Sequence, residues 1–106
     1  MTKIKVFRKD GHIVALEVKG HTGFKEEGSD VLCAGISVLT QSALLGLLEV
    51  AKVNTESKKG DGYLYFQIAD YTLESDAILN TMYLSLKDLA SGYKRHIKME
   101  DCKYDY

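Results

Sequence analysis

The feature that most constrains the fold is a stretch without any charge, Val31 to Leu48, eighteen residues long. This length is close to the minimum for a helix that spans a membrane. The stretch contains two glycines and several hydroxyl and amide side chains, so it is a poor membrane span. Its apolar side chains surround the helix nearly completely. We therefore expect a central, mostly buried helix in a soluble domain and no contact with a membrane.

Short segments on both sides of this helix have the patterns of strands. Residues 3–8 alternate between apolar and polar side chains, and Asp10-Gly11 after them is typical of a hairpin turn, so the mostly apolar residues 13–19 are expected to form the returning strand. Residues 53–58 and 63–68 predict a second pair of strands around a turn rich in glycine. Both pairs are expected to be antiparallel because their connections are short.

Two helices and a last strand complete the expected order. The long helix is expected from Ser29 or Asp30, either of which can be its N-cap, to about Ala51. Apolar residues at helical spacing predict a second helix over residues 74–93, followed by a strand over residues 96–100. The order ββαββαβ indicates an α+β fold in which two helices pack on one face of a largely antiparallel sheet.

Size and charge limit the classes of function. A chain of 106 residues is expected to form a single domain over residues 1–106. The net charge of −1 argues against direct binding of nucleic acid, which requires an excess of lysine and arginine. The first residues alternate like a strand and do not resemble a signal peptide, so we expect a cytoplasmic protein with reduced cysteines.

Cys33 is the candidate nucleophile. If the helix begins at Ser29 or Asp30, Cys33 lies in its first turn, where the helix dipole favours a thiolate. A cysteine in an apolar helix is more often a small buried hydrophobe. The expected position at the helix start is therefore what makes Cys33 a candidate for catalysis.

His21 is the candidate general base, twelve positions before Cys33. It lies in a glycine-rich segment, residues 20–28, that shows no regular periodicity and that we expect to be a mobile loop. Gly20 and Gly23 permit a tight turn that returns the imidazole to the helix start. In this position His21 would accept the proton of the thiol.

Asp30 and Ser37 are weaker candidates. Asp30 is either an N-cap, which we favour, or a carboxylate that orients the ring of His21. Ser37 lies one helical turn beyond Cys33, although packing or a hydrogen bond to the helix backbone is the commoner role of such a serine. Cys102, His96 and His12 are not spaced as zinc ligands, and no cofactor motif occurs. We expect neither a metal nor a cofactor.

With these residues in view, the chain resembles the Prp family of ribosomal-processing cysteine proteases. The family signature is a Gly-His pair, a loop with glycine, and Gly-x-Asp-(Ile/Val)-x-Cys-Ala-(Ala/Gly)-x-Ser at the start of the long helix. This chain has Gly20-His21 and then Gly28-Ser-Asp-Val-Leu-Cys-Ala-Gly-Ile-Ser37. The length and the ββαββαβ order also resemble the family, so the resemblance covers nearly the whole chain. One departure is Thr22, where the family more often has alanine.

The resemblance implies a homodimeric cytoplasmic endopeptidase with Cys33 as nucleophile, His21 as base, and Asp30 and Ser37 as assistants. The implied partner is a precursor of the twenty-seventh large-subunit ribosomal protein, whose short N-terminal extension is removed after paired aromatic residues. Two other functions stay open. One is a non-enzymatic ribosome-assembly or binding factor in which Cys33 only packs. The other is a redox-sensing thiol protein with Cys102 as the resolving partner.

Overall fold

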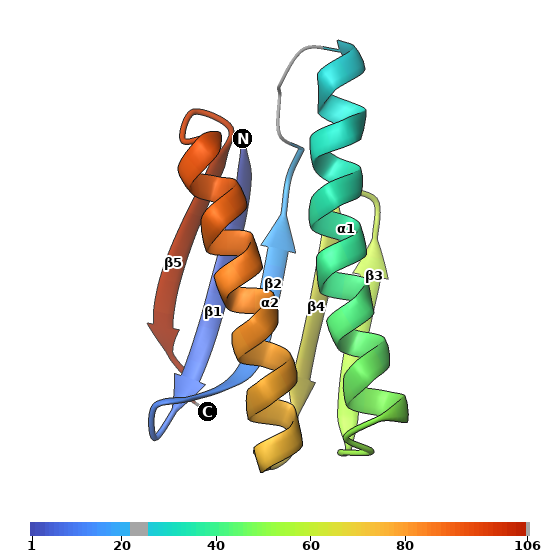
Figure 1. The fold of residues 1–106 in the computed structure, drawn as a ribbon, viewed down its shortest axis with the longest axis vertical. Helices are drawn as coiled ribbons and strands as arrows, with labels where there is room; N and C mark the ends of the chain where they lie inside the picture. Colours follow the sequence, from blue (N-terminus) through green and yellow to red (C-terminus); the bar gives the residue numbers. More distant parts are fainter. Residues whose placement is uncertain (22–25, 106) are drawn as a thin grey trace.

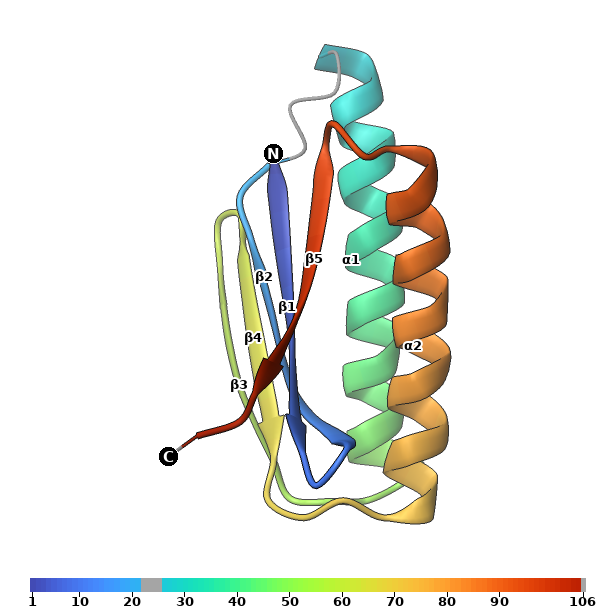
Figure 2. The ribbon, with the colours of Figure 1, turned by 90° about the vertical axis from the view of Figure 1, so that its left-hand side faces the viewer.

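The predicted order ββαββαβ is confirmed by the computed structural model, which describes residues 1–21 and 26–105, with side chains for residues 1–21 and 31–105. The elements are β1 (Thr2–Lys9), β2 (His12–Lys19), α1 (Glu26–Glu49), β3 (Thr55–Gly60), β4 (Tyr63–Ile68), α2 (Leu73–Gly92) and β5 (Ile97–Lys103). They form two layers, because both helices lie side by side on one face of the sheet (Figure 1; Figure 2).

The sheet is mixed but mostly antiparallel, with the strand order β3-β4-β2-β1-β5. The pairs β1–β2, β2–β4 and β3–β4 are antiparallel, and β1–β5 is parallel. The parallel pair forms because α2 carries the chain back along the sheet before β5 begins (Figure 1). The expected α+β class is therefore confirmed.

The core lies between the sheet and the two helices. In β1, the buried residues Thr2, Ile4 and Val6 alternate with less buried ones, as expected for a strand with one covered face. In α2, the buried residues lie three or four positions apart. Full burial of one large aliphatic or aromatic side chain contributes about 1.5–3 kcal/mol. The largest fully buried apolar side chains are Phe66, Ile4, Ile13, Leu16, Leu47, Leu79, Leu86 and Val6.

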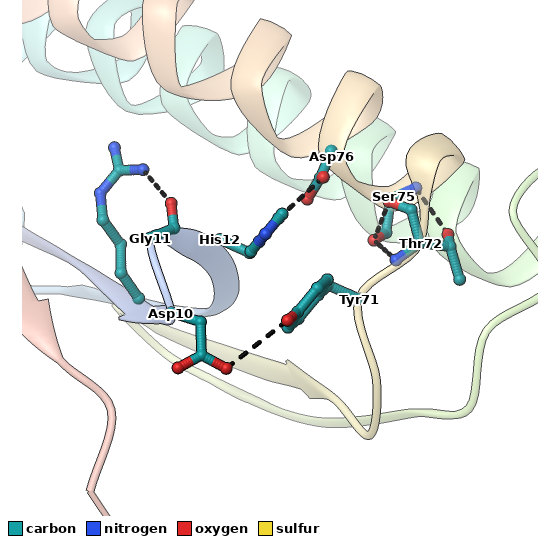
Figure 3. Close-up of polar contacts among 8 residues, drawn as sticks. Asp10, Gly11, His12, Tyr71, Thr72, Ser75 and Asp76 are labelled. Carbon is teal, nitrogen blue, oxygen red and sulfur yellow. Dashed lines mark hydrogen bonds and ion pairs between the residues drawn. The ribbon is translucent and has the colours of Figure 1, made fainter.

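The start of α2 is fixed by hydrogen bonds that the sequence pattern anticipated only approximately. Thr72 is the N-cap, and its hydroxyl oxygen accepts from the N–H of Ser75 at 3.0 Å. The hydroxyl oxygen of Ser75 accepts from the N–H of Thr72 at 2.8 Å, which completes a capping box (Figure 3). The helix therefore begins at Leu73, one residue before the predicted boundary.

The helix α1 begins earlier than predicted. The expectation of an N-cap at Ser29 or Asp30 is wrong, because the backbone is helical from Glu26. Glycine lowers helix propensity by about 1 kcal/mol, so Gly28 pointed to a loop. Acidic residues are favoured in a first turn, and Glu26 and Glu27 occupy that turn here. Of the expected loop over residues 20–28, residues 22–25 lie outside the described part of the chain, and residues 26–28 belong to the helix.

The prediction that α1 is mostly buried is also wrong. Only 28% of the segment Val31–Glu49 is buried, although this segment is long and apolar enough to cross a membrane by length and composition. One side of the helix packs on the sheet through residues such as Ala43 and Leu47. The other side exposes Val31, Val38 and Leu45, whose exposed fractions are 75%, 67% and 61%. Among the described elements, none forms a further layer over this side of α1 (Figure 2).

The boundaries of the two edge strands follow their partners. The strand predicted over residues 53–58 is observed as β3, Thr55–Gly60, because it pairs residue by residue with β4. The strand predicted over residues 96–100 is longer, Ile97–Lys103, because the parallel pairing with β1 continues to Arg8 and Lys103. The length of each edge strand depends on the strand that it pairs with, and the periodicity of one segment contains no information about its partner.

Candidate active site

A pocket of about 210 Å³ lies where the end of β2, the helix α1 and the turn between β3 and β4 meet. Both residues of the predicted Cys–His pair line it, and so does Ser37. Segments far apart in the sequence thus contribute to one cavity at one end of the sheet. The complete lining consists of Thr2, Val18, Gly20, His21, Cys33, Ile36, Ser37, Thr40, Gln41, Lys59, Gly60, Gly62, Tyr63 and Leu64.

His21 is held at the pocket by two glycines with positive φ. Gly20 (φ +95°) donates its N–H to the carbonyl oxygen of Gly62 at 2.8 Å, which joins the end of β2 to the β3–β4 turn. A Cβ atom on Gly62 (φ +63°) would lie 2.9 Å from Nε2 of His21, so the imidazole occupies the space that a side chain would need. The expected role of Gly20 in turning the chain is supported by its φ, whereas Gly23 lies outside the described residues.

Cys33 is partly buried on the side of α1 that lines the pocket. It is not joined in a disulfide. Because α1 begins at Glu26, Cys33 is its eighth residue and does not lie in the first turn. The predicted reason for its reactivity, proximity to the helix start, is therefore wrong, since the effect of the helix dipole falls off within one turn. The structural reason to consider Cys33 reactive is instead that it lines the same pocket as His21.

Asp30 is the fifth residue of α1, so it is not the N-cap. It lies three positions before Cys33, and residues at this spacing share a face of a helix. Its side chain lies outside the described part of the structure. The orienting role considered for Asp30 stays a prediction.

Ser37 is part of a hydrogen-bonded row that sequence reasoning missed. Gln41 donates from Nε2 to Oγ of Ser37 at 2.5 Å, and Lys59 donates from Nζ to Oε1 of Gln41 at 2.9 Å. The spacing of Cys33, Ser37 and Gln41, four residues each, was the available signal for the helical part. No local signal pointed to Lys59, which arrives from β3.

Tyr63, which lines the pocket, is also tied to a neighbouring strand by its side chain. Its hydroxyl donates to Oε2 of Glu17 at 3.0 Å, which ties the first residue of β4 to β2. Burial, followed by the hydrogen bond and the negative charge of Glu17, raises the pKa of Tyr63 above its ordinary value. The tyrosine therefore stays neutral and keeps donating its proton.

Cys102 lies far from the pocket. In the parallel register it is opposite Phe7, five residues along β1 from Thr2 and therefore roughly 16 Å from the pocket end of that strand. Its side chain is on the same face as Phe7, away from the helices, because neighbouring residues of a strand alternate in direction. Two cysteines with Cα atoms more than about 7 Å apart cannot pair without movement of the backbone. This geometry argues against Cys102 as an internal resolving partner for Cys33.

A thiol and an imidazole in one pocket are the side chains that a cysteine hydrolase needs, and this is the class that the fold and the pocket define. Residues 1–98 match the family described as cysteine protease Prp. The chain belongs to this family, and it is a cysteine protease.

Individual relatives extend over most of the chain. The ribosomal processing cysteine protease Prp of Bacillus subtilis is 26% identical over 98 residues, which cover 85% of this chain and 87% of the relative. The essential ribosomal processing protease Prp from S. aureus is similar in fold in two crystal structures. Its complex with a covalently linked product peptide has a TM-score of 0.87, with 23% identity, and covers 95% of this chain and 99% of the other. Its complex with a substrate peptide has a TM-score of 0.85, with 22% identity and the same coverage.

Proposed function

We propose that this protein is an endopeptidase in which Cys33 is the nucleophile and His21 its base. The observation that carries the proposal is that the two side chains line the same pocket. We further propose that it removes the N-terminal extension of the twenty-seventh large-subunit ribosomal protein. The name of the B. subtilis relative, which refers to ribosomal processing, and the peptides bound to the S. aureus structures support a peptide substrate of this origin.

The proposed reaction is acyl transfer. His21 accepts the proton of the Cys33 thiol, and the sulfur attacks the scissile carbonyl carbon. The protonated His21 gives its proton to the leaving amine as the peptide bond breaks, which leaves a thioester on Cys33. Water then attacks the thioester, His21 accepts a proton from that water, and the free thiol and a new carboxyl group are released.

Asp30 is proposed as the carboxylate that orients the ring of His21. Its position inside α1 removes the capping role that competed with this one. Its place three residues before Cys33 puts it near the pocket end of the helix. Replacement with asparagine keeps the shape and removes the charge, so Asp30→Asn is expected to lower the cleavage rate without abolishing it.

The extended substrate is proposed to pair with β3. This strand is an edge of the sheet, and its last residues, Lys59 and Gly60, line the pocket. An edge strand offers unpaired backbone groups to a peptide, and peptide-binding domains often use this mode. A substrate with N-methylated backbone amides on one side of the cleavage site is expected to be cut more slowly than the unmodified peptide.

The protein is proposed to act in the cytoplasm as a homodimer, as the family resemblance implies. The cytoplasm keeps thiols reduced, which a cysteine nucleophile requires. Support for a dimer comes from the exposed apolar residues Val31, Val38 and Leu45, seven positions apart on α1, a spacing typical of helix pairing. In sedimentation experiments Leu45→Glu is expected to weaken the dimer and Lys58→Glu, on β3, to leave it unchanged. A wild-type protein that sediments as a monomer at micromolar concentration would contradict this part of the proposal.

The test of the dyad follows cleavage of a peptide that carries the extension and its paired aromatic residues, with mass spectrometry as the readout. Wild type is expected to cut once, after the aromatic pair. Cys33→Ala is expected to lose activity, and Cys102→Ala, on the other face of the sheet, to keep it. Cleavage at a normal rate by Cys33→Ala would overturn the mechanism. Binding to ribosomal particles without any cleavage by wild type would favour a non-enzymatic assembly factor.

A further inference from the structure

A row of polar residues runs along α1 from the proposed nucleophile. Cys33, Ser37 and Gln41 follow one another at intervals of four residues, so they lie on one face of the helix. All three line the pocket, as does Lys59 at the end of β3. The hydrogen-bonded part of the row joins Ser37, one helical turn from the proposed nucleophile, to a cation on another element.

Lys59 determines how the amide of Gln41 is oriented. A lysine ammonium group only donates hydrogen bonds, so the atom that it meets at 2.9 Å is the amide oxygen of Gln41. The amide nitrogen must then point the other way, toward Oγ of Ser37 at 2.5 Å. Since this nitrogen only donates, Oγ of Ser37 accepts.

The proton of the Ser37 hydroxyl is therefore left for a different acceptor. Other hydroxyls in the two helices donate to a backbone carbonyl four residues earlier, for example Thr40 to Ile36 at 2.9 Å and Thr81 to Ala77 at 2.7 Å. Within residues 1–21 and 31–105, the Ser37 hydroxyl accepts from Gln41 and donates to none of the described atoms, the carbonyl oxygen and the sulfur of Cys33 included. The residue one turn before Ser37 on the same face is Cys33.

We propose that Gln41 and Lys59 are positioning residues that leave the hydroxyl proton of Ser37 available to turn toward the sulfur of Cys33 when that sulfur becomes a thiolate. The inference rests on the proposed function, because it assigns a partner to the nucleophile of that mechanism. A hydroxyl that donates to a thiolate stabilises the attacking form of the cysteine, and charge-assisted hydrogen bonds are about twice as strong as neutral ones. The side chains of Gln41 and Lys59 act on the reaction only through Ser37.

The sharpest test reverses the direction of the hydrogen bond between Ser37 and position 41 without changing the size of the side chain there. Gln41→Glu keeps the contact with Lys59, but a carboxylate only accepts, so the hydroxyl of Ser37 turns to donate to position 41 and away from Cys33. We expect the pH midpoint of Cys33 alkylation to move to higher pH and kcat to fall about tenfold, with KM nearly unchanged. Ser37→Ala is expected to have the same effect as Gln41→Glu.

Lysine variants provide the matched controls. Lys59→Met frees the amide of Gln41 to rotate and is expected to shift the alkylation profile partly, whereas Lys59→Arg, which still donates, restores it. Lys58→Met changes the neighbouring exposed lysine of β3, which does not line the pocket, and is expected to leave the profile unchanged.

Two outcomes separate this inference from the proposed function. If Cys33→Ala is inactive but Gln41→Glu alkylates and cleaves as wild type does, the row has no role and the dyad stands. If Cys33→Ala cleaves normally, the proposed function fails independently of the row. A Gln41→Glu protein with altered KM and an unchanged alkylation profile would also overturn the inference, because a merely structural effect would act in that way. Circular dichroism and urea unfolding establish that each variant is folded.

Discussion

The strand β2 has a histidine near each end, and the two are held in opposite ways. His12, its first residue, contacts Oδ2 of Asp76 through Nδ1 at 2.8 Å, and its ring stacks on Tyr71 with centroids 3.7 Å apart and planes 5° apart (Figure 3). His21, two residues after the last residue of β2, is exposed, rests against Gly62 and lines the pocket. Among the described side chains, no carboxylate pairs with it.

The difference shows how one residue type serves structure at one end and chemistry at the other. His12 joins the β1–β2 hairpin to the first turn of α2, and both its ring face and Nδ1 are already occupied. The position of His21 is determined by backbone geometry at Gly20 and Gly62, which leaves its ring available to a substrate. A histidine that must transfer protons needs a defined position and an accessible ring nitrogen. Glycines can define the position of the ring without covering its nitrogen, because they have no side chain.

The largest expected effect separates the two histidines directly. His21→Gln keeps a polar side chain but cannot act as the base, so cleavage is expected to fall about a thousandfold. His12→Gln is expected to cleave at nearly the wild-type rate, because His12 does not line the pocket. Peptide cleavage rates of both purified variants measure the difference. Equal losses of cleavage rate in the two variants would contradict the assignment of a catalytic role to His21 and a structural role to His12.

The next effect concerns the glycine under the imidazole. Gly62→Ala places a methyl group 2.9 Å from Nε2 of His21, so the ring must move, and we expect an approximately hundredfold loss of kcat/KM. Gly11→Ala is the matched control, since Gly11 also has a positive φ (+83°) but open space around it.

Both alanine variants are expected to lose about 1 kcal/mol of unfolding free energy from backbone strain in the left-handed region. Only Gly62→Ala is expected to lose activity. If Gly11→Ala loses as much activity, strain rather than displacement of His21 explains the result. Urea unfolding and cleavage kinetics on the same preparations distinguish the two causes.

A smaller effect is expected at the structural end. Asp76→Asn removes the negative charge that faces His12 and the start of α2, and is expected to lower the unfolding free energy by about 1 kcal/mol. The contact is only partly buried, with side-chain exposures of 36% for His12 and 23% for Asp76, which keeps the effect modest. Asp88→Asn, an exposed change on the same helix, serves as control. The cleavage rate is expected to be unchanged in both variants. A large loss of activity in Asp76→Asn would mean that the His12 end of β2 also affects catalysis at the His21 end.

The smallest effect is a pH dependence at the pocket end. The pKa of Tyr63 is raised above 10.0, first by burial and then by Glu17. As pH rises, the unfolded chain therefore loses the Tyr63 proton before the folded chain does. The contribution of Tyr63 to the free energy of unfolding is complete below pH 10.0 and is lost as pH rises through the pKa of the folded state. In Tyr63→Phe the alkaline decline is expected to be shallower, and urea midpoints measured across alkaline pH test this. An unchanged slope would assign the decline to other groups, such as Tyr65, whose pKa is raised by burial and then by Tyr104.

Local patterns were reliable where one element determines its own structure. The strand-forming residues after the glycine-rich turn predicted a strand over residues 63–68, which the structure confirms as β4, and the predicted boundaries of α2 differ from the observed ones by one residue. Prediction failed where a boundary depends on competing local effects. Gly28 suggested a loop, but α1 begins at Glu26, and this moved Cys33 from the first turn to the eighth position of the helix.

The sequence by itself determined the element order, the fold class and the two residues that now line the pocket, because hydrophobic periodicity and the Gly-His and Asp-x-x-Cys patterns are local. The tertiary structure alone decided which distant residues complete that pocket. Gly62 supports His21 and Lys59 orients Gln41, and both come from the β3–β4 hairpin, a different part of the chain from β2 and α1. It also left one side of α1 exposed. Contacts between distant segments depend on strand order and on which faces are covered, and no local periodicity contains that information.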